Sequence, residues 1–293
     1  MDLILNLVVD GICEGARYAI LGMGFALIFN TQRMFDISFG GVYIWCGFAL
    51  WILVTQAGIN LTLAGIIVLA IGYLLSYAIQ KIYLTKVRSR SGPPVGIFLG
   101  SMALLMAMEA ITSIFWGGTI RVGRIGEAAL FKWGVVQLSD IKILKVIFAI
   151  SIFLLIQYVF MRSPMGVNAR AIATNQLLAK IVGLQNEKII IFTTCLGCTV
   201  VAIDAVLVCA DTGVYPAIGF QSVMIAFMSV ILGGIGSFTG AAIGGLIIGV
   251  VRTVAVLEFP TLWQELILFL ILFLIIAFRP IGIWGIKDWK SEV

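Results

Sequence analysis

Apolar residues fill most of the chain in runs of about 20, and short polar stretches separate the runs. A run of this length can cross the hydrocarbon core of a bilayer as an α-helix, in which the backbone satisfies its own hydrogen bonds. We therefore expect an all-α polytopic membrane protein with about nine transmembrane helices, roughly eight to ten. The predicted segments are Leu3–Phe29, Ile37–Ala57, Leu61–Tyr83, Val95–Trp116, Ile141–Phe160, Ile189–Ala210, Ile218–Leu232, Ala241–Val256 and Leu262–Phe278.

Two places in this pattern predict a helix that is broken or re-entrant. They are Phe35–Gly41, between the first two segments, and the glycine-rich stretch Gly233–Gly240. Adjacent glycines lower helix stability, and a helix that ends at membrane depth exposes backbone groups to a cavity. Tight helix packing is the alternative explanation for Gly233, Gly234, Gly236 and Ser237.

The longest polar stretch is Met161–Lys188, and it lies between two apolar segments that hold it at one membrane face. Its cationic residues Arg170 and Lys180 alternate with apolar residues at helical spacing. This pattern predicts a short amphipathic helix with an apolar side and a cationic side. Gly183 then ends the helix. The apolar positions are Ala171, Ile172, Ala173, Leu177, Leu178, Ile181 and Val182.

Composition agrees with a membrane protein and narrows the organisation to one domain. Hydrophobic residues make up 61% of the chain, charged residues only 11%, and the mean hydropathy is +1.14. Soluble domains carry about 25% charged residues. No linker divides the chain, so we expect a single integral membrane domain over 1–293. A nucleotide-binding P-loop motif is absent from the sequence, and Leu3–Phe29 lacks the features of a cleaved signal peptide.

The net charge of +5 is explained by topology and does not point to nucleic acid. Cations gather in three places, Lys86–Arg90, the Met161–Lys188 stretch and Arg279–Lys290, which the positive-inside rule assigns to the cytoplasm. Alternation then places the N-terminus outside, together with Gly117–Asp140. That outer stretch is the weak point of the topology, because it and the next segment hold several cations. The remaining outer stretches are Asn60, Asp211–Gly219 and Glu258–Thr261, and the cations in question are Arg121, Arg124, Lys132 and Lys142.

Enzyme and metal chemistry find no support in the residue types. The chain has no histidine, which is the commonest metal ligand and general base. All five cysteines lie in or beside apolar runs, and Cys195 and Cys198 form a lone CxxC. We interpret these thiols as small buried apolar residues.

Charged residues inside the apolar segments are candidates for function. Glu14 and Arg17 stand one helical turn apart and predict an ion pair, which Asp10 either joins or leaves to face water. Glu109 and Asp204 have no partner nearby in sequence. Each either contacts the substrate or a water-filled path, or makes a bond between helices.

The glycines of one later segment recur at helical spacing. Gly240, Gly244, Gly245 and Gly249 leave a flat stripe on which another helix can approach closely. We interpret the stripe as a packing surface.

Four motifs together resemble one known family. Val230–Gly249 reads VILGGIGSFTGAAIGGLIIG and resembles the late glycine-rich segment of the permease subunits of branched-chain amino acid ABC importers, of the LivH/LivM type. Met165–Gln185 is similar to that family's cytoplasmic coupling loop, and Arg279–Gly285 to its C-terminal motif. Gly15–Gly41 resembles the first helix and the following turn. The four matches occur in family order and span almost the whole chain.

The resemblance implies a transport subunit that works by alternating access in a bacterial plasma (inner) membrane. Its partners would be a second permease, identical or homologous, two cytoplasmic ATP-binding subunits and an extracytoplasmic substrate-binding protein. ATP and magnesium would bind to the ATPase subunits, so this chain would hold no cofactor. The Met161–Lys188 loop would dock on an ATPase, with Ala171, Ile172, Ala173 and Leu177 packing there; contact with anionic lipid headgroups is the alternative. The implied coupling residues are Met165, Gly166, Arg170, Ala171, Ala173, Asn175, Ala179, Lys180 and Gly183.

Two departures from the family pattern leave the solute open. The first-turn motif Asn-Phe-Ala-His-Gly is replaced here by Asp36–Gly40, and Arg252 stands where an acidic residue is common. Branched-chain amino acids are the implied substrates, while urea, short amides or another small solute are the alternative. An ion-coupled secondary transporter fits the composition but does not need the patterned loop. The candidate path residues are Asp36, Ser38, Phe39, Gly40, Glu109, Asp204, Gly233, Gly234, Gly236 and Ser237.

Overall fold

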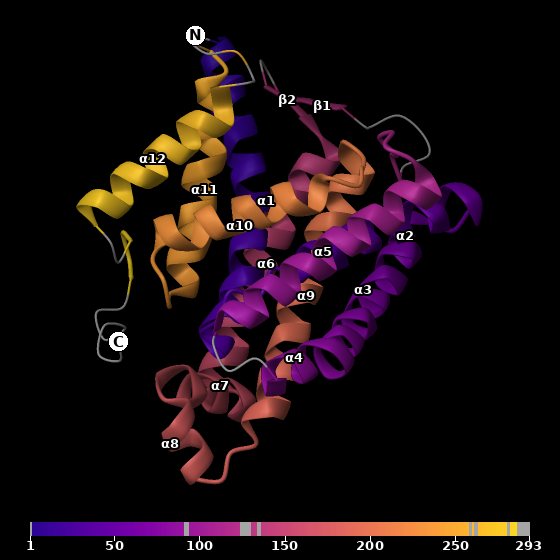
Figure 1. Cartoon of the computed structure of the whole chain (residues 1–293). Helices are drawn as coiled ribbons and strands as arrows, with labels where there is room; N and C mark the ends of the chain where they lie inside the picture. The colour runs from indigo at the N-terminus through magenta and orange to yellow at the C-terminus, as the bar shows by residue number, and fades with distance from the viewer. Residues whose placement is uncertain are drawn as a thin grey trace. The chain divides into compact units, whose positions relative to one another are not determined.

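The computed structural model describes residues 2–90, 94–123, 130–133, 136–257, 260, 263–279 and 282–285. Helices dominate this part of the chain (Figure 1). They are α1 (Asp2–Gln32), α2 (Phe39–Trp51) with the π-helix η1 (Ile52–Gln56), α3 (Leu61–Ala78) with the π-helix η2 (Ile79–Leu84), α4 (Thr85–Arg90), α5 (Pro94–Trp116), α6 (Asp140–Arg162), α7 (Pro164–Thr174), α8 (Gln176–Ile181), α9 (Asn186–Asp211), α10 (Ile218–Gly233), α11 (Phe238–Ala255) and α12 (Gln264–Phe278).

The helices confirm the prediction of a polytopic helical membrane protein. Within the described residues, seven helical stretches are long and apolar enough to cross a bilayer. Two shorter apolar helices, Ile218–Gly233 and Leu266–Phe278, fall where the sequence predicts further crossings. The count of about nine therefore stays a prediction. Arg124, most of Glu258–Thr261, Pro280, Lys287 and Lys290 lie outside the described residues.

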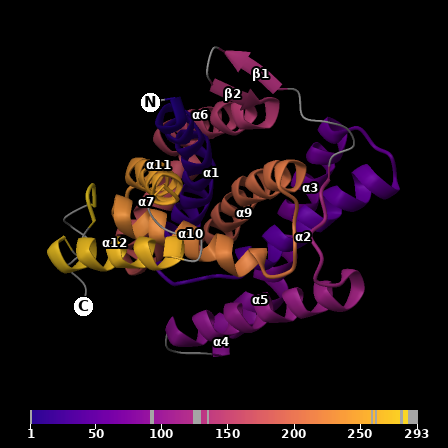
Figure 2. The same ribbon diagram turned by 90° about the horizontal axis from the view of Figure 1, so that it is seen from above.

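A short antiparallel hairpin departs from the all-helical expectation. Strands β1 (Leu130–Trp133) and β2 (Val136–Ser139) pair with Leu130 opposite Ser139. In β2, apolar and polar residues alternate with a period of two, which is a strand pattern. Figure 2 shows the hairpin beside the beginning of α6, which follows it directly in the chain. The segment is too short for its strand pattern to be recognised in the sequence beside the strong helical pattern of its neighbours.

The chain groups into two compact units. Unit 1 comprises Met1–Ala26, Gly126–Phe153 and Met224–Val293, and unit 2 comprises Leu27–Ile125 and Leu154–Val223. Helix α1 therefore contributes its longer part to unit 1 and its last turns to unit 2. A single permease domain over 1–293 stays a prediction.

Unit 2 is built around α2. This helix packs against α3, α5 and α9, and its Tyr43, Phe48 and Leu50 side chains are buried. A helix that is apolar on all sides belongs inside a bundle. Helix α9 is buried along most of its length as well. The turn between α1 and α2 lies in this unit.

Glycines set the packing of unit 1. A Cβ at Gly245 would collide with the backbone of Tyr18 and Ala19, and one at Gly249 would collide with the backbone of α1 at Gly15. Glycine therefore allows α11 and α1 to approach to backbone contact. On its other side, α11 meets α10, where Gly244 lies against Ser229 and Gly240 lies against Gly233. The predicted glycine stripe is thus placed between two helices.

Candidate functional site

The Met161–Lys188 loop folds into two short helices, α7 and α8, where the sequence predicted one. Pro164 starts α7, and the Ser163 hydroxyl oxygen caps it by accepting a hydrogen bond from the Met165 N–H at 3.3 Å. Asn175 leaves helical geometry and caps α8, its Oδ1 accepting from the Leu178 N–H at 2.9 Å. A side chain that caps a new helix competes with continuation of the old one, which explains the division. Gly183 follows α8 with φ +89°.

One face of this helix pair is buried against the rest of unit 2. Ile172, Ala179 and Ile190 of α9 form a small apolar cluster. Gly166 is buried as well. A Cβ at this position would come within 2.6 Å of Phe160 Cα and Val159 O at the end of α6. Ile172, which we had expected to pack on a partner, instead fixes the pair to its own chain. The side chain of Leu177 lies outside the described residues.

The opposite face is exposed and largely apolar. Ile181 and Val182 are 77% and 80% exposed, and Leu178 is exposed beside them. Arg170 and Lys180 are exposed cations on the same pair of helices. Ala171, Met165 and Val167 are also exposed, and Ala173 and Asn175 are half-buried. Apolar side chains of this size outside a membrane span mark an interaction surface.

Hydrogen bonds tie the helix pair to the end of α1. Arg33, which has φ +52° just after α1, donates from Nη2 to the Thr174 carbonyl at 2.9 Å. Gln176 Nε2 donates to the carbonyl oxygens of Thr31 at 3.4 Å and Gln32 at 3.2 Å. Figure 1 shows α7 and α8 at the end of unit 2 that also holds α4 and the beginning of α9. These neighbours agree with the predicted common, cytoplasmic side of Lys86–Arg90 and the Met161–Lys188 loop.

A recess of about 790 Å³ opens between α4 and the α8–α9 junction. It carries three cations, Arg88, Lys180 and Lys188, and one carboxylate, Glu187. Polar side chains line most of the remainder. They are Thr85, Gln176, Gln185 and Asn186. The recess therefore favours negatively charged groups.

The turn between α1 and α2 is organised by Asp36, which is 1% exposed. Its Oδ1 accepts from the N–H of Ser38 at 3.0 Å and from the Ser38 hydroxyl at 2.6 Å. Its Oδ2 accepts from Gln80 Nε2 at 2.7 Å and Gln32 Nε2 at 3.3 Å. Four donors satisfy a buried carboxylate, so this aspartate acts as an organising centre within its own chain.

The other path candidates of unit 2 lie on α2 itself and on its neighbours α5 and α9. Phe39 is buried, and Gly40 lies so close to α10 that a Cβ would be 3.0 Å from Gly219 O. Asp204 is fully buried on α9 and accepts a 3.0 Å hydrogen bond from the Tyr43 hydroxyl. Glu109 is half-buried on α5, and no residue in the described ranges forms a hydrogen bond or ion pair with it. Of these two acids, Asp204 is thus engaged between helices, whereas Glu109 has no hydrogen-bond or ion-pair partner within the part of the chain that the structure describes.

In unit 1, the glycine-rich break meets the C-terminal motif. Helix α10 ends at Gly233, and Gly234 and Gly236 take φ values of +118° and +91° that favour glycine. Ser237 Oγ caps α11 by accepting from the Gly240 N–H at 3.0 Å. The predicted break is therefore present.

The C-terminal segment covers the end of α10. Ile283 N–H donates to Leu232 O at 3.1 Å, and Trp284 N–H donates to Gly233 O at 2.9 Å. These bonds satisfy carbonyls that a helix end leaves without partners. The two motifs are separated by about 50 positions in the chain, yet they form one structural element.

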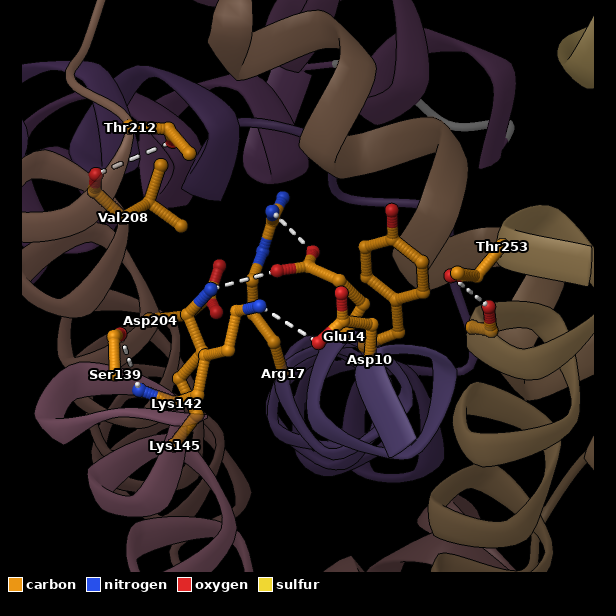
Figure 3. Close-up of polar contacts among 12 residues, drawn as sticks. Asp10, Glu14, Arg17, Ser139, Lys142, Lys145, Asp204, Val208, Thr212 and Thr253 are labelled. Carbon is orange, nitrogen blue, oxygen red and sulfur yellow. Dashed lines mark hydrogen bonds and ion pairs between the residues drawn. The ribbon is translucent and has the colours of Figure 1, made fainter. Parts of the chain in front are cut away.

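A charged cluster links α1 and α6 in unit 1 (Figure 3). The predicted pair is present, with Arg17 Nη1 3.0 Å from Glu14 Oε2. Lys145 Nζ lies 2.6 Å from Glu14 Oε1, and Lys142 Nζ lies 2.6 Å from Asp10 Oδ1. Lys142, a cation that weakened the sequence-based topology, is thus paired within the chain. Sequence reasoning missed Lys145, although it stands about one helical turn after Lys142, as Glu14 stands about one turn after Asp10.

Arg252 has its own partners on neighbouring helices of unit 1. Its Nη1 donates to the Tyr18 hydroxyl at 2.6 Å, and its Nε donates to Gln264 Oε1 at 3.3 Å. This departure from the family pattern is therefore accommodated between α1, α11 and α12.

The described residues offer no metal centre. No group of three or more His, Cys, Asp or Glu side chains among them is placed to hold an ion. The five cysteines are buried free thiols.

Comparison with known proteins gives matches along almost the full length. The family described as "Branched-chain amino acid transport system / permease component" matches residues 7–276. The high-affinity branched-chain amino acid transport system permease protein BraD of Pseudomonas aeruginosa is 27% identical over 300 residues, covering 96% of this chain and 95% of BraD. LivH of Escherichia coli K12, a permease of the same description, is 28% identical over 298 residues, covering 94% of each protein. Among solved structures, PsaBC from Streptococcus pneumoniae in complex with Fab has a TM-score of 0.47 and 16% identity, covering 94% of this chain and 88% of that one.

Proposed function

Because this chain belongs to the family of permease components of branched-chain amino acid transport systems, we propose that it is the membrane-spanning subunit of an ATP-driven importer in a bacterial plasma membrane. A second permease subunit would complete the pathway. Two cytoplasmic ATPases would bind ATP and magnesium, and an extracytoplasmic binding protein would deliver the solute. Transport would proceed by alternating access.

Branched-chain amino acids are the proposed substrates. The relatives BraD and LivH carry this substrate in their names. The altered Asp36–Gly40 turn was the main reason to consider urea or short amides. Asp36 already accepts four hydrogen bonds from its own chain, so the carboxylate is not an extra ligand for a different solute. This arrangement favours the family's substrate class.

The exposed face of α7–α8 is the observation that carries the proposed coupling to an ATPase. Its bulky apolar side chains Leu178, Ile181 and Val182 stand beside the cations Arg170 and Lys180. Burying one such side chain in a partner's groove contributes about 1.5–3 kcal/mol. The buried face and the bonds to α1 hold the pair firmly, so force applied there would be passed to the membrane helices.

A protein partner explains this face better than lipid does. A helix that rests on headgroups keeps its apolar side toward the acyl chains, whereas here the apolar side chains Ile172 and Ala179 pack on the protein. The apolar residues that remain exposed are interspersed with Arg170 and Lys180, and the cationic recess lies nearby. A groove with apolar walls and acidic edges would match both features.

Co-purification of the ATPase with this chain tests the proposal. The double variant Arg170→Glu and Ile181→Asp should insert into membranes at the wild-type level and lose the ATPase subunit. Lys86→Glu is the matched control, because it reverses an exposed cation of α4 on the same predicted cytoplasmic side of the membrane. Normal ATPase association in the double variant would refute docking through α7–α8.

A further inference from the structure

We propose that Gln32, the last residue of α1, is the positioning residue that transmits movement of α7–α8 to the Asp36–Ser38 turn at the start of α2. The inference rests on the proposed function, in which an ATPase moves α7–α8. It assigns the transmission to one side chain and its hydrogen-bond partners.

The backbone of Gln32 forms a hydrogen bond with the α7–α8 helix pair. Gln176, the first residue of α8, donates from its side chain to the Gln32 carbonyl at 3.2 Å. The next residue of the chain, Arg33, donates a 2.9 Å hydrogen bond to the Thr174 carbonyl at the end of α7. Both bonds lie at the junction of α7 and α8, so a displacement of this junction acts directly on the last turn of α1.

The side chain of Gln32 extends in the other direction and is 2% exposed. Its Nε2 donates to Thr194 Oγ1 of α9 at 2.7 Å and to Asp36 Oδ2 at 3.3 Å. Its Oε1 accepts from Arg88 Nη2 of α4 at 3.0 Å. A primary amide has two N–H donors and one carbonyl acceptor, and all three groups are engaged here. The side chain thus joins α9, α4 and the turn.

From Asp36 the connection continues into α2. The same carboxylate that receives Gln32 also holds the N–H and hydroxyl of Ser38, the residue before α2. Tyr43, further along α2, donates a hydrogen bond from its hydroxyl to the carboxylate of Asp204 on α9. A buried network changes between discrete arrangements because leaving one member unpaired is costly. A shift of Gln32 therefore repositions the beginning of α2.

A role in stability alone would satisfy the same bonds, so the test measures coupling. The complex of this chain with its partner permease, ATPases and binding protein would be reconstituted in vesicles, and leucine uptake and ATP hydrolysis measured together. Gln32→Leu keeps the size of the side chain and removes its hydrogen bonds. We expect normal subunit association and ATP hydrolysis within about twofold of wild type, with uptake per ATP lower by about tenfold.

Two adjacent threonines of α9 provide a matched pair. Thr193 and Thr194 are both buried and both bond to carbonyls of their own helix, but Thr194 alone accepts from Gln32. Thr194→Val should lower uptake per ATP, and Thr193→Val should leave it unchanged. The pair decides the question even if Gln32→Leu does not fold.

A wild-type ratio of uptake to ATP hydrolysis in Gln32→Leu and Thr194→Val would overturn the inference. So would equal losses in the two threonine variants. Failure of the proposed function is a separate result, because the wild-type complex would then show no ATP-driven uptake at all.

Discussion

The ammonium group of Lys145 lies 2.6 Å from the carboxylate of Glu14, although 131 positions separate the two residues in the chain. Lys145 is fully buried, and Arg17 approaches the other oxygen of the same carboxylate at 3.0 Å. Both helices are long and apolar enough to cross a bilayer, where a charge without a partner is costly. Glu14 is therefore shared by two cations and fixes α6 against α1.

Replacing Glu14 should destabilise the protein more than replacing either lysine of α6. Glu14→Gln removes the carboxylate shared by Lys145 and Arg17 and leaves the buried ammonium of Lys145 facing a neutral amide, which is costly because a buried charge needs a compensating one. Lys145→Met leaves Glu14 with Arg17 and should cost less. Thermal unfolding in detergent would give this order. Lys142→Met is the control, because the Lys142–Asp10 pair is more exposed and should matter least. The reverse order of stability losses would contradict the role of Glu14 as the shared partner.

The α1–α11 contact should not tolerate a side chain at Gly249. Gly249→Ala places a methyl group against the backbone of Gly15, and overpacking of this kind costs about 1–3 kcal/mol. Gly118→Ala provides the control, since within the described residues no atom beyond its own chain neighbours lies within 4 Å of a Cβ there. The yield of monodisperse protein and its unfolding temperature should fall only for Gly249→Ala. Equal behaviour of the two variants would argue against backbone contact.

Gly166 should matter for coupling because it lets α7 lie against the end of α6. Gly166→Ala would push α7 away from Phe160 and weaken ATPase association, measured by co-purification. Gly118→Ala is the control, because it adds the same methyl group at a glycine outside the Met161–Lys188 loop, where no neighbour among the described residues lies within 4 Å of the new Cβ. We expect the Gly118 variant to retain the ATPase. Retention by the Gly166 variant would show that the α6–α7 contact does not position the docking face.

Glu109 should affect transport more than stability. Its carboxylate is half-buried within a membrane span and has no hydrogen-bond or ion-pair partner in the described ranges. Glu109→Gln should therefore change the free energy of unfolding by less than about 0.5 kcal/mol. It should lower the rate of amino acid uptake in reconstituted vesicles, as expected for a residue at the pathway. A clear loss of stability with unchanged uptake would assign Glu109 to packing.

Sequence reasoning recovered the features that depend on local spacing. Apolar runs located the membrane helices, adjacent glycines located the break after Gly233, and a spacing of three residues predicted the Glu14–Arg17 pair. Such features are encoded within one or two helical turns. The division of the coupling loop at Asn175 had a local signal too, since Asn is a favoured cap.

The remaining features depend on tertiary contacts and could not be read from spacing. Gln32 and Thr194 are 162 positions apart, and the lysine partners of Glu14 and Asp10 lie on α6. A sequence can flag a polar residue within an apolar run, as at Asp204, but it does not say which distant residue will satisfy it. The β-hairpin was missed because its strands have only four residues each, so the alternation in β2 is too short to stand out beside the long apolar helices.

ATP-dependent uptake of leucine by vesicles tests directly whether this chain is the membrane subunit of an ATP-driven importer. The vesicles would contain this chain with its partner permease, the ATPase subunits and the binding protein, and each component would be omitted in turn. The account predicts uptake that requires every component together with ATP. Leucine uptake by this chain alone, driven by an ion gradient without ATP, would contradict it.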